Sequence, residues 1–600
     1  MKRKYLIYAC IGFLFGFFTL TGQKLAMQGN LIWDKTYTVK TLLSSLLIGM
    51  LAGAVAVWGP GIFRRLSAVI PRIKHGDSRD VHTRGEDILQ KDSVPQRDFM
   101  MQKNHAAQGR RILRKSLTPQ QIFGLSFLLI FLCWLPVYLA YYPGICAYDV
   151  TVQTGQIVDH AYNDHHPIAH TLLLAGSMRL GESVFADVNT GLAVLTFVQM
   201  TCLAAVIAWG IALLAGRGIR RGFLILLQIY GMAYPFHFYM SVSVIKDVFF
   251  SVFFLIQMLA LCEVIRRRKS AVDGYDVLFF LSGVGMQLFR TNGRYAMLVL
   301  AVFVLMALLF GRGARRFWGK LCINCVLSLL LGSLCLSGLF RLTGAQQGDR
   351  REMLSMPIQQ LARCMLYHGG VGELAEDDGT MAAEDRKLIN DFLLDESYRE
   401  YRLEISDPVK SHTNTYVVRY RTGDFVRTYF RLLGQYPGDF INAALAVNAG
   451  YLYVGDESHA DINKNGVDRG LGYVQTRWVD AELNPRGIYQ DSKWEGLHEF
   501  LEKWADENAY LKIPVLKFLF VPGVFLWLYL LLAGRLAERR NYAGCVPLAL
   551  VLGYYITLFL GPAVQLRYLY PLMLTLPFAA LFLLCGSEED KFERNFQTTY

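Results

Sequence analysis

The chain has 600 residues, of which 53% are hydrophobic and only 18% are charged, and its mean hydropathy is +0.28. A soluble protein of this size would expose much of that apolar surface to water, so the composition excludes an ordinary soluble enzyme. The formal net charge of +12 does not require a nucleic-acid partner, because the basic residues lie in short connections between apolar segments. We predict a mainly α-helical, polytopic membrane protein in contact with membrane lipids.

Twelve apolar segments have the length and composition of membrane-spanning helices. They cover about residues 5–22, 41–58, 121–141, 189–214, 223–240, 248–265, 276–290, 295–311, 320–340, 513–534, 543–560 and 567–585. With this count, the connections rich in Lys and Arg all fall on one side, so we predict that both termini are cytoplasmic. The first segment can be read as a signal peptide, but no small-residue cleavage site follows it, and we interpret it as an anchor.

The spans and two long connections predict six regions. They are an N-terminal transmembrane hairpin (1–58), a basic cytoplasmic loop (59–120), a transmembrane core (121–340), an extracytoplasmic domain (341–512), C-terminal transmembrane helices (513–586) and a cytoplasmic tail (587–600). The loop has few aromatic residues and no expected catalytic role. The domain holds many Trp and Tyr residues and helical patterns at 383–394 and 423–453, which predict a mainly helical core. Only Cys146 and Cys364 fall in outer segments, so at most one disulfide is expected there.

The first large outer loop, residues 142–188, carries the residues that most suggest chemistry. Asp149 follows the end of the predicted span 121–141 and a Pro-Gly turn, and His165 and His166 precede an apolar amphipathic run. An aspartate here can also be a helix cap. The three side chains could instead bind a divalent metal, although neither HxxxH nor HExxH spacing is present. We therefore predict a catalytic Asp149 without a dedicated metal site and leave a divalent cation as the one alternative cofactor.

Several more charged residues are predicted at the same membrane face. They are Lys246, Asp247, Arg290, Arg294 and Arg567. Each alone fits an interface anchor whose charged head reaches water. Together, charges close to the hydrocarbon indicate function, and clustered Lys and Arg side chains suit a phosphate or pyrophosphate.

The domain 341–512 offers two weaker candidates. Residues 351–365 predict an amphipathic element with Gln360 and Arg363 facing the membrane site, or else plain surface packing. Residues 461–468 resemble the first half of a calcium loop, but position twelve is Gly472 rather than Glu, and a polar turn rich in Asn and Gly is the alternative.

The combination of YPG, Asp149, HHP, IKD, an R-x-N-G turn and RYLYP resembles the C-type (GT-C) membrane glycosyltransferases, including a group of multi-pass bacterial proteins. The resemblance covers about residues 121–585. It implies a GT-C-like core, with Asp149 in the position of the essential aspartate of the first outer loop and His165 and His166 in an element of H-P-P type. It also implies a polyprenyl-phosphate-linked sugar as donor. This chain has Asp149-Val150-Thr151 where many relatives have Asp-Glu or Asp-x-Asp, so metal dependence does not carry over.

The expected function is therefore an inverting glycosyl transfer to an envelope glycan, lipid or protein outside the cytoplasmic membrane of a bacterium. Asp149 would accept the proton of the acceptor hydroxyl, Lys246, Arg290 and Arg567 would stabilise the leaving phosphate, and His166 would orient a substrate. The alternatives are a transporter or lipid-linked glycan flippase and a non-enzymatic envelope-assembly protein. The span centres are nearly free of charged residues and the two halves do not look alike, which disfavours a coupled transporter.

Overall fold

A computed structural model of the chain describes residues 1–28, 31, 34–69, 117–146, 148–311, 313–348, 350–455, 488–507 and 509–585. Within these ranges the regular secondary structure is helical, and the only β-type pairings are isolated bridges. The prediction of a mainly α-helical chain is confirmed.

Nine of the described helices are long and apolar enough to cross a membrane, as expected for a polytopic membrane protein. They are α1 (Lys2–Gln28), α2 (Lys35–Val69), α4 (Pro119–Ala140), α7 (Val188–Gly216), α10 (Lys246–Arg267), α12 (Thr291–Phe310), α13 (Arg315–Thr343), α24 (Tyr542–Phe559) and α25 (Leu566–Cys585). The predicted segment 223–240 forms two helices, α8 (Arg221–Ala233) and α9 (Pro235–Val242), with a bend of 49° between them. Counted as one span, this pair makes ten.

Two other predicted spans form shorter helices. Segment 276–290 is α11 (Gly274–Phe289), with 16 residues, and segment 513–534 is divided between α22 (Pro514–Leu519) and α23 (Pro522–Glu538). The breaks before Pro235 and Pro522 have one cause, because proline lacks the N–H that the preceding turn would bond and disfavours a helical residue before it. Tyr234 and Val521 are accordingly extended, with ψ angles of 116° and 109°.

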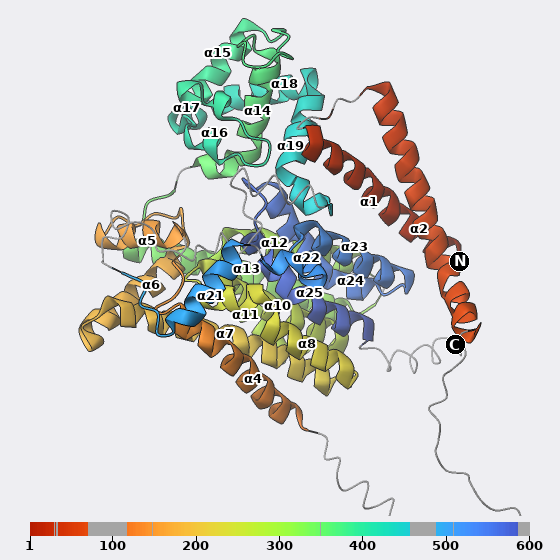
Figure 1. The fold of residues 1–600 in the computed structure, drawn as a ribbon, viewed down its shortest axis with the longest axis vertical. Helices are drawn as coiled ribbons and strands as arrows, with labels where there is room; N and C mark the ends of the chain where they lie inside the picture. Colours follow the sequence, from red (N-terminus) through yellow and green to blue (C-terminus); the bar gives the residue numbers. More distant parts are fainter. Residues whose placement is uncertain are drawn as a thin grey trace, which may run out of the picture.

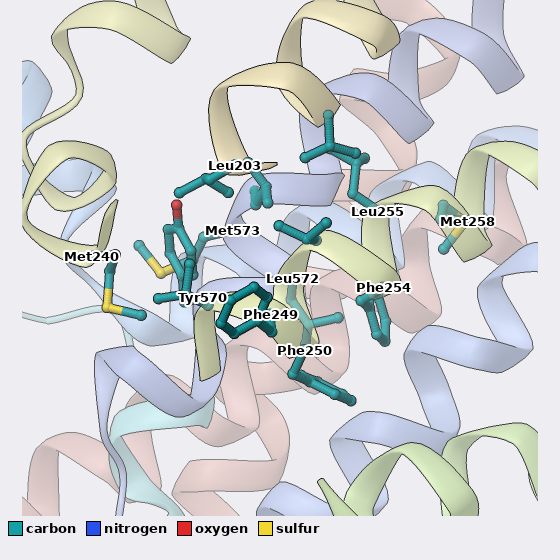
Figure 2. Close-up of a cluster of buried hydrophobic side chains, with 14 of the residues drawn as sticks. Leu203, Met240, Phe249, Phe250, Phe254, Leu255, Met258, Tyr570, Leu572 and Met573 are labelled. Carbon is teal, nitrogen blue, oxygen red and sulfur yellow. The ribbon is translucent and has the colours of Figure 1, made fainter. Parts of the chain in front are cut away.

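Helix α10 lies at the centre of the bundle and packs against α7, α11, α24 and α25. Figure 2 shows side chains of α10 meeting those of α7, α9 and α25 in one cluster of buried hydrophobic residues. Its labelled members are Leu203, Met240, Phe249, Phe250, Phe254, Leu255, Met258, Tyr570, Leu572 and Met573. A helix that is apolar on all sides belongs in such a central position.

The two ends of α10 differ in the charges around them. We call them the Lys246 end and the Glu263 end; at 1.5 Å per residue these two residues lie about 25 Å apart along the helix. The carboxylate of Glu263 is fully buried and binds Arg217 Nε at 2.6 Å and Arg267 Nε at 3.2 Å. The Lys246 end carries the residues of the predicted site.

Helices α1 and α2 pack against each other beside the bundle (Figure 1). Each contributes two glycines four residues apart, Gly12 and Gly16 from α1 and Gly49 and Gly53 from α2. A Cβ at Gly12 would lie 2.5 Å from the Cβ of Ala52, and one at Gly49 would lie 2.6 Å from the carbonyl oxygen of Ala9. This is the close backbone approach that small residues permit between membrane helices.

Between α13 and α21 (Glu495–Asp506), the domain forms a separate helical layer at one end of the bundle (Figure 1). Its elements are η2 (Arg350–Leu354), α14 (Ser355–His368), α15 (Ala383–Phe392), η3 (Leu394–Glu400), α16 (Asp407–Ser411), α17 (Thr415–Tyr420), α18 (Thr422–Gln435) and α19 (Pro437–Leu452). Helices α21 and η6 (Ala509–Lys512) follow in the chain and pack against the bundle, at α4 and α22. Ser406 donates its backbone N–H to Pro562 in the turn before α25, at 2.9 Å. The domain therefore lies over the Lys246 end.

Gln360 and Arg363 lie inside this domain and do not face the membrane site, so that prediction is wrong. Arg363 is fully buried and donates from Nε to Asp439 at 2.9 Å. Gln360 bonds the backbone of Phe440 and the hydroxyl of Tyr429. Both side chains therefore take part in packing and hydrogen bonding within the domain.

Some predictions fall on residues outside the described ranges, including the calcium-like segment 461–468, most of the loop 59–120 and the tail 587–600. Cys364 is a buried free thiol, so the disulfide to Cys146 that the sequence allows is not formed.

Candidate functional site

A short parallel pairing brings the first outer loop to the start of α10. Ile145 donates its N–H to the carbonyl of Val242 at 2.8 Å and accepts from Val244 at 2.9 Å. Gly144 makes this turn possible, because its φ is +147° and a Cβ there would lie 2.6 Å from Thr196 Oγ1. Gln199 of α7 donates to the carbonyl of Ser243 at 2.6 Å and so fixes the second segment.

Four helices begin around the site, and their first residues supply it. Asp149 lies in the first turn of α5 (Tyr148–Val158), Lys246 and Asp247 open α10, and Arg567 is the second residue of α25. Arg290 is the N-cap of α12. Helix N-termini present unpaired N–H groups and partial positive charge, so their convergence favours an anion.

Asp149 is held by two cations that reach it from distant parts of the chain. Its Oδ2 lies 2.6 Å from Lys246 Nζ and 2.9 Å from Arg567 Nη1. The Asp149 and Arg567 side chains are 9% and 4% exposed, and that of Lys246 is 12% exposed. The structure thus brings together three residues that the sequence had marked separately.

A second carboxylate completes the charged cluster. Asp247 is fully buried and forms an ion pair with Arg290, and its Oδ2 lies 3.8 Å from Arg567 Nη1. Arg567 therefore lies between the two carboxylates. The cluster contains three permanent cations, Lys246, Arg290 and Arg567, and two carboxylates, which leaves one net positive charge.

The structure adds neighbours that the sequence reasoning did not single out. The ring of Tyr568 lies 4.8 Å from the Arg290 guanidinium and 4.7 Å from that of Arg567. Gln565 accepts a hydrogen bond from Arg567 Nε at 3.0 Å, and Tyr554 accepts one from Arg290 at 3.4 Å. Gln565 and Tyr568 flank Arg567 in the motif QLRYLYP, which is the one signal that could have drawn attention to them.

His166 joins the cluster from the loop before α6 (Ile168–Leu180), which continues into η1 (Gly181–Phe185). Its Nδ1 lies 3.0 Å from Lys246 Nζ and 4.0 Å from Asp149 Oδ2. An ammonium can only donate, so Nδ1 accepts and the ring proton is on Nε2. Burial and the adjacent Lys246 charge lower the pKa of His166 to about 2, which keeps the ring neutral.

The charges around Asp149 make it a strongly ionised carboxylate. Burial alone would raise its pKa, but Arg567 and Lys246 outweigh burial, and the pKa lies well below the ordinary value. In this arrangement Asp149 is an anion with little tendency to take up a proton.

The remaining predicted residues lie outside this network. His165 is exposed and its ring packs edge-on against His166, with 4.5 Å between the ring centres. Arg294 lies one turn beyond Arg290 on α12, and among the described residues no ion pair connects it to the cluster. His170, which was not among the predicted site residues, lies in the first turn of α6, bonds Gln153 of α5 at 3.0 Å and helps to hold these two helices together.

Nowhere in the described ranges do three or more His, Cys, Asp or Glu side chains group so that they could hold a metal ion. At the site itself, both carboxylates are engaged by Lys and Arg side chains. The residues that surround Asp149 therefore suit an anionic ligand better than a divalent cation.

Comparison of the sequence with known protein families identifies a match. Residues 157–597 match DUF6020, which is described as a family of unknown function, and this range covers more than half of the chain. The chain belongs to the DUF6020 family. No match was found among curated proteins or among solved structures.

The DUF6020 region includes most of the charged cluster. It contains His166, Lys246, Asp247, Arg290 and Arg567, whereas Asp149 lies eight residues before its first residue. The carboxylate between Lys246 and Arg567 thus comes from the segment that precedes the matched range.

The Glu263 end of the bundle contains residues of the DUF6020 region and of α4, which precedes that region. A cavity of about 550 Å³ opens there between α4, α7 and α11, lined mostly by apolar side chains with Arg217 and Tyr275. It lies at the opposite end of α10 from Asp149 and takes no part in the site.

Proposed function

We propose that this DUF6020 protein is an inverting membrane glycosyltransferase that uses a polyprenyl-phosphate-linked sugar. The acceptor is an envelope glycan, lipid or protein outside the cytoplasmic membrane of a bacterium. The observation that supports it best is the cluster of Asp149 with Lys246 and Arg567, a carboxylate and two cations at the end of a helical bundle. Such a cluster offers a base for a hydroxyl and donors for a phosphate.

The proposed reaction is a direct displacement at the anomeric carbon. The acceptor oxygen forms a bond to that carbon as the bond to the phosphate oxygen breaks, and the electron pair leaves with the phosphate. The acceptor proton goes to Asp149. The phosphate changes from a diester with one negative charge to a monoester with up to two, and Lys246, Arg290 and Arg567 are the groups available to stabilise the added charge.

The topology that we propose has twelve spans, cytoplasmic termini and an extracytoplasmic site. Helix α11 and the bent pair α8 and α9 support it because each connects the two ends of the bundle. Helix α11 follows Asp273, which pairs with Arg267 at the Glu263 end, and leads to Arg290 at the Lys246 end. Helix α8 begins at Arg221, four residues after Arg217 of the Glu263 end, and α9 ends at Val242 beside Ile145.

The decisive experiment uses purified protein in proteoliposomes with radiolabelled polyprenyl-phosphate hexoses and pentoses, and in parallel with nucleotide sugars. Comparison of envelope sugars with and without the gene identifies the sugar and acceptor to use. We expect transfer from the lipid-linked donors only. Equal use of a nucleotide sugar would overturn the donor, and movement of labelled lipid across the bilayer without transfer would replace this function by that of a flippase.

A pair of variants tests the base. Asp149→Asn should reduce turnover by about 100-fold or more, because the amide cannot accept the proton. The matched control is Asp159→Asn, which removes an exposed carboxylate one residue beyond the end of the same helix, α5, and should leave turnover unchanged. Turnover above about a tenth of the wild-type rate in Asp149→Asn would exclude Asp149 as the base.

A further inference from the structure

The two cations that hold Asp149 are also the donors that a substrate phosphate needs. Lys246 Nζ and Arg567 Nη1 converge on one oxygen, Asp149 Oδ2, at 2.6 Å and 2.9 Å. We propose that the substrate phosphate competes with the Asp149 carboxylate for Lys246 and Arg567, and that phosphate binding releases Asp149 to act as the base. This inference rests on the proposed function. It adds the order of the steps, because the donor must bind before the acceptor proton moves to Asp149.

The resting arrangement explains why a release step is needed. A general base works best when its pKa is near the ambient pH. Arg567 and Lys246 overcome the effect of burial and keep the pKa of Asp149 well below its ordinary range. As long as Lys246 and Arg567 both remain bound to Asp149, the carboxylate is a weak base. It therefore gives little driving force for removing the proton of an acceptor hydroxyl.

The charge of the cluster matches that of the phosphate both before and after transfer. Three cations and two carboxylates give +1, which balances the single negative charge of a phosphodiester. Once Asp149 takes up the acceptor proton, three cations and one carboxylate give +2, which balances a phosphate monoester dianion. Asp247 keeps its pairing with Arg290 in both stages, so the change comes from Asp149 alone.

A buried hydrogen-bond donor at the same place points independently to a ligand. His166 accepts from Lys246 through Nδ1, so Nε2 carries the proton. His166 is only 5% exposed, and among the described residues its Nε2 has no hydrogen-bond partner. Leaving such a donor unsatisfied is costly, and an oxygen of the incoming substrate would satisfy it.

The first test measures binding without transfer. The probe is a polyprenyl methyl phosphate, which has the charge of the donor and no sugar to lose, and the matched neutral ligand is the polyprenyl alcohol. Asp149→Asn removes the competing carboxylate and should bind the probe about tenfold more tightly, because a charge-assisted hydrogen bond need no longer be broken. Its affinity for the alcohol should not change.

Lys246→Gln and Arg567→Gln distinguish a failure of the competition from a failure of the phosphate site. Each should weaken probe binding about tenfold by removing a charged donor. Equal or weaker binding by Asp149→Asn, together with these losses, would overturn the competition and leave the phosphate site in place. Unchanged binding in both cation variants would overturn the phosphate site, and with it the proposed donor.

The second test makes its main measurement on the wild-type protein and uses a variant only to assign the proton. The titratable and charged groups around Asp149 are Lys246 and Asp247 of α10, Arg567 and Tyr568 of α25, Arg290, His166 of its own loop, and His170 of α6. When Lys246 and Arg567 bind the phosphate instead of Asp149, the pKa of Asp149 rises. The complex then takes up protons, so the affinity for the probe increases as pH falls.

Calorimetry near pH 5.5 in buffers of different ionisation enthalpy should show proton uptake on probe binding. Binding without uptake would overturn the release of Asp149. In Asp149→Asn the uptake should be absent, and its persistence there would assign the proton to another group and overturn the proposal.

Discussion

Ile145 and Ser243 form a parallel bridge, although they lie in different membrane-associated segments of the chain. The bridge aligns the chain that leaves α4 with the chain that enters α10, so Asp149 and Lys246, 97 positions apart, meet at 2.6 Å. This backbone pairing, together with the Gln199 side chain that bonds the Ser243 carbonyl, therefore positions Asp149 relative to Lys246.

The turn before this bridge gives the first prediction. Gly144→Ala should lower both thermal stability and turnover, because φ is +147° there and the new Cβ would meet Thr196 Oγ1 at 2.6 Å. A residue forced into such a region costs about 1–3 kcal/mol. The matched control is Gly155→Ala on α5, where nothing lies within 4 Å and a helical alanine is favourable. Thermal unfolding in detergent and the transfer assay measure both effects. Equal behaviour of the two variants would mean that the turn does not position the site.

The glycine contact between α1 and α2 gives a second prediction, in which stability falls and turnover does not. Gly49→Leu should destabilise the hairpin, because a side chain at that position meets the Ala9 carbonyl oxygen, 2.6 Å from an ideal Cβ. Overpacking of this kind costs about 1–3 kcal/mol. Turnover of the folded fraction should remain, since α1 and α2 contribute no residue to the cluster. Gly124→Leu on α4, where nothing lies within 4 Å, is the control and should change neither property. A loss of turnover per folded molecule in Gly49→Leu would connect the hairpin to the site.

Much of the fold follows from the sequence because a membrane imposes length and apolarity on each span. All twelve predicted segments coincide with helices, and the departures occur at Pro235 and Pro522, where the chain breaks inside an apolar run. A proline in the sequence marks a position where a helix can break. Whether the helix continues past that proline depends on its packing against neighbouring helices. Pro136 and Pro571 accordingly lie inside continuous helices.

The sequence marked the main charged residues of the cluster but not their pairings. Charged residues at span ends identified Asp149, Lys246 and Arg567, yet the contact between Asp149 and Arg567 spans 418 positions and no local pattern encodes it. Arg290 and Arg294 looked equivalent in the sequence, and only packing assigns the first to Asp247. Tyr568 was missed because a tyrosine in an apolar run looks like an interfacial or core residue.

Two cysteine positions test the proposed topology. Asp159 and Lys269 are exposed and lie beyond the ends of α5 and α10. Three proposed crossings separate them, namely α7, the pair α8 and α9, and α10. In intact cells, a membrane-impermeant maleimide should label Asp159→Cys and not Lys269→Cys, with the unmodified protein as control for its own cysteines. Labelling of both from the same side would show that the number of crossings between them is even, and the predicted parity would be wrong.

The buried histidines give the last prediction, which concerns stability against pH. Burial is the main cause that lowers the pKa of His166 to about 2 and that of His170 to about 4, from an ordinary value of 6.5. Below pH 6.5 these histidines bind protons in the unfolded chain but stay neutral in the folded protein. The free energy of unfolding therefore falls as pH falls toward these pKa values. At pH 5 each histidine costs on the order of 2 kcal/mol.

Thermal unfolding in detergent at pH 7.5 and pH 5.0 measures this effect. The drop in stability between the two pH values should be smaller in His170→Gln than in the wild type, because the variant has no proton to bind in the unfolded state. His412→Gln is the control, since it removes a histidine whose side chain is 40% exposed. Asp149 stays ionised in both states across this range, so it does not contribute to the difference. An equal drop in His170→Gln and the wild type would show that His170 takes up protons in the folded protein as readily as in the unfolded chain.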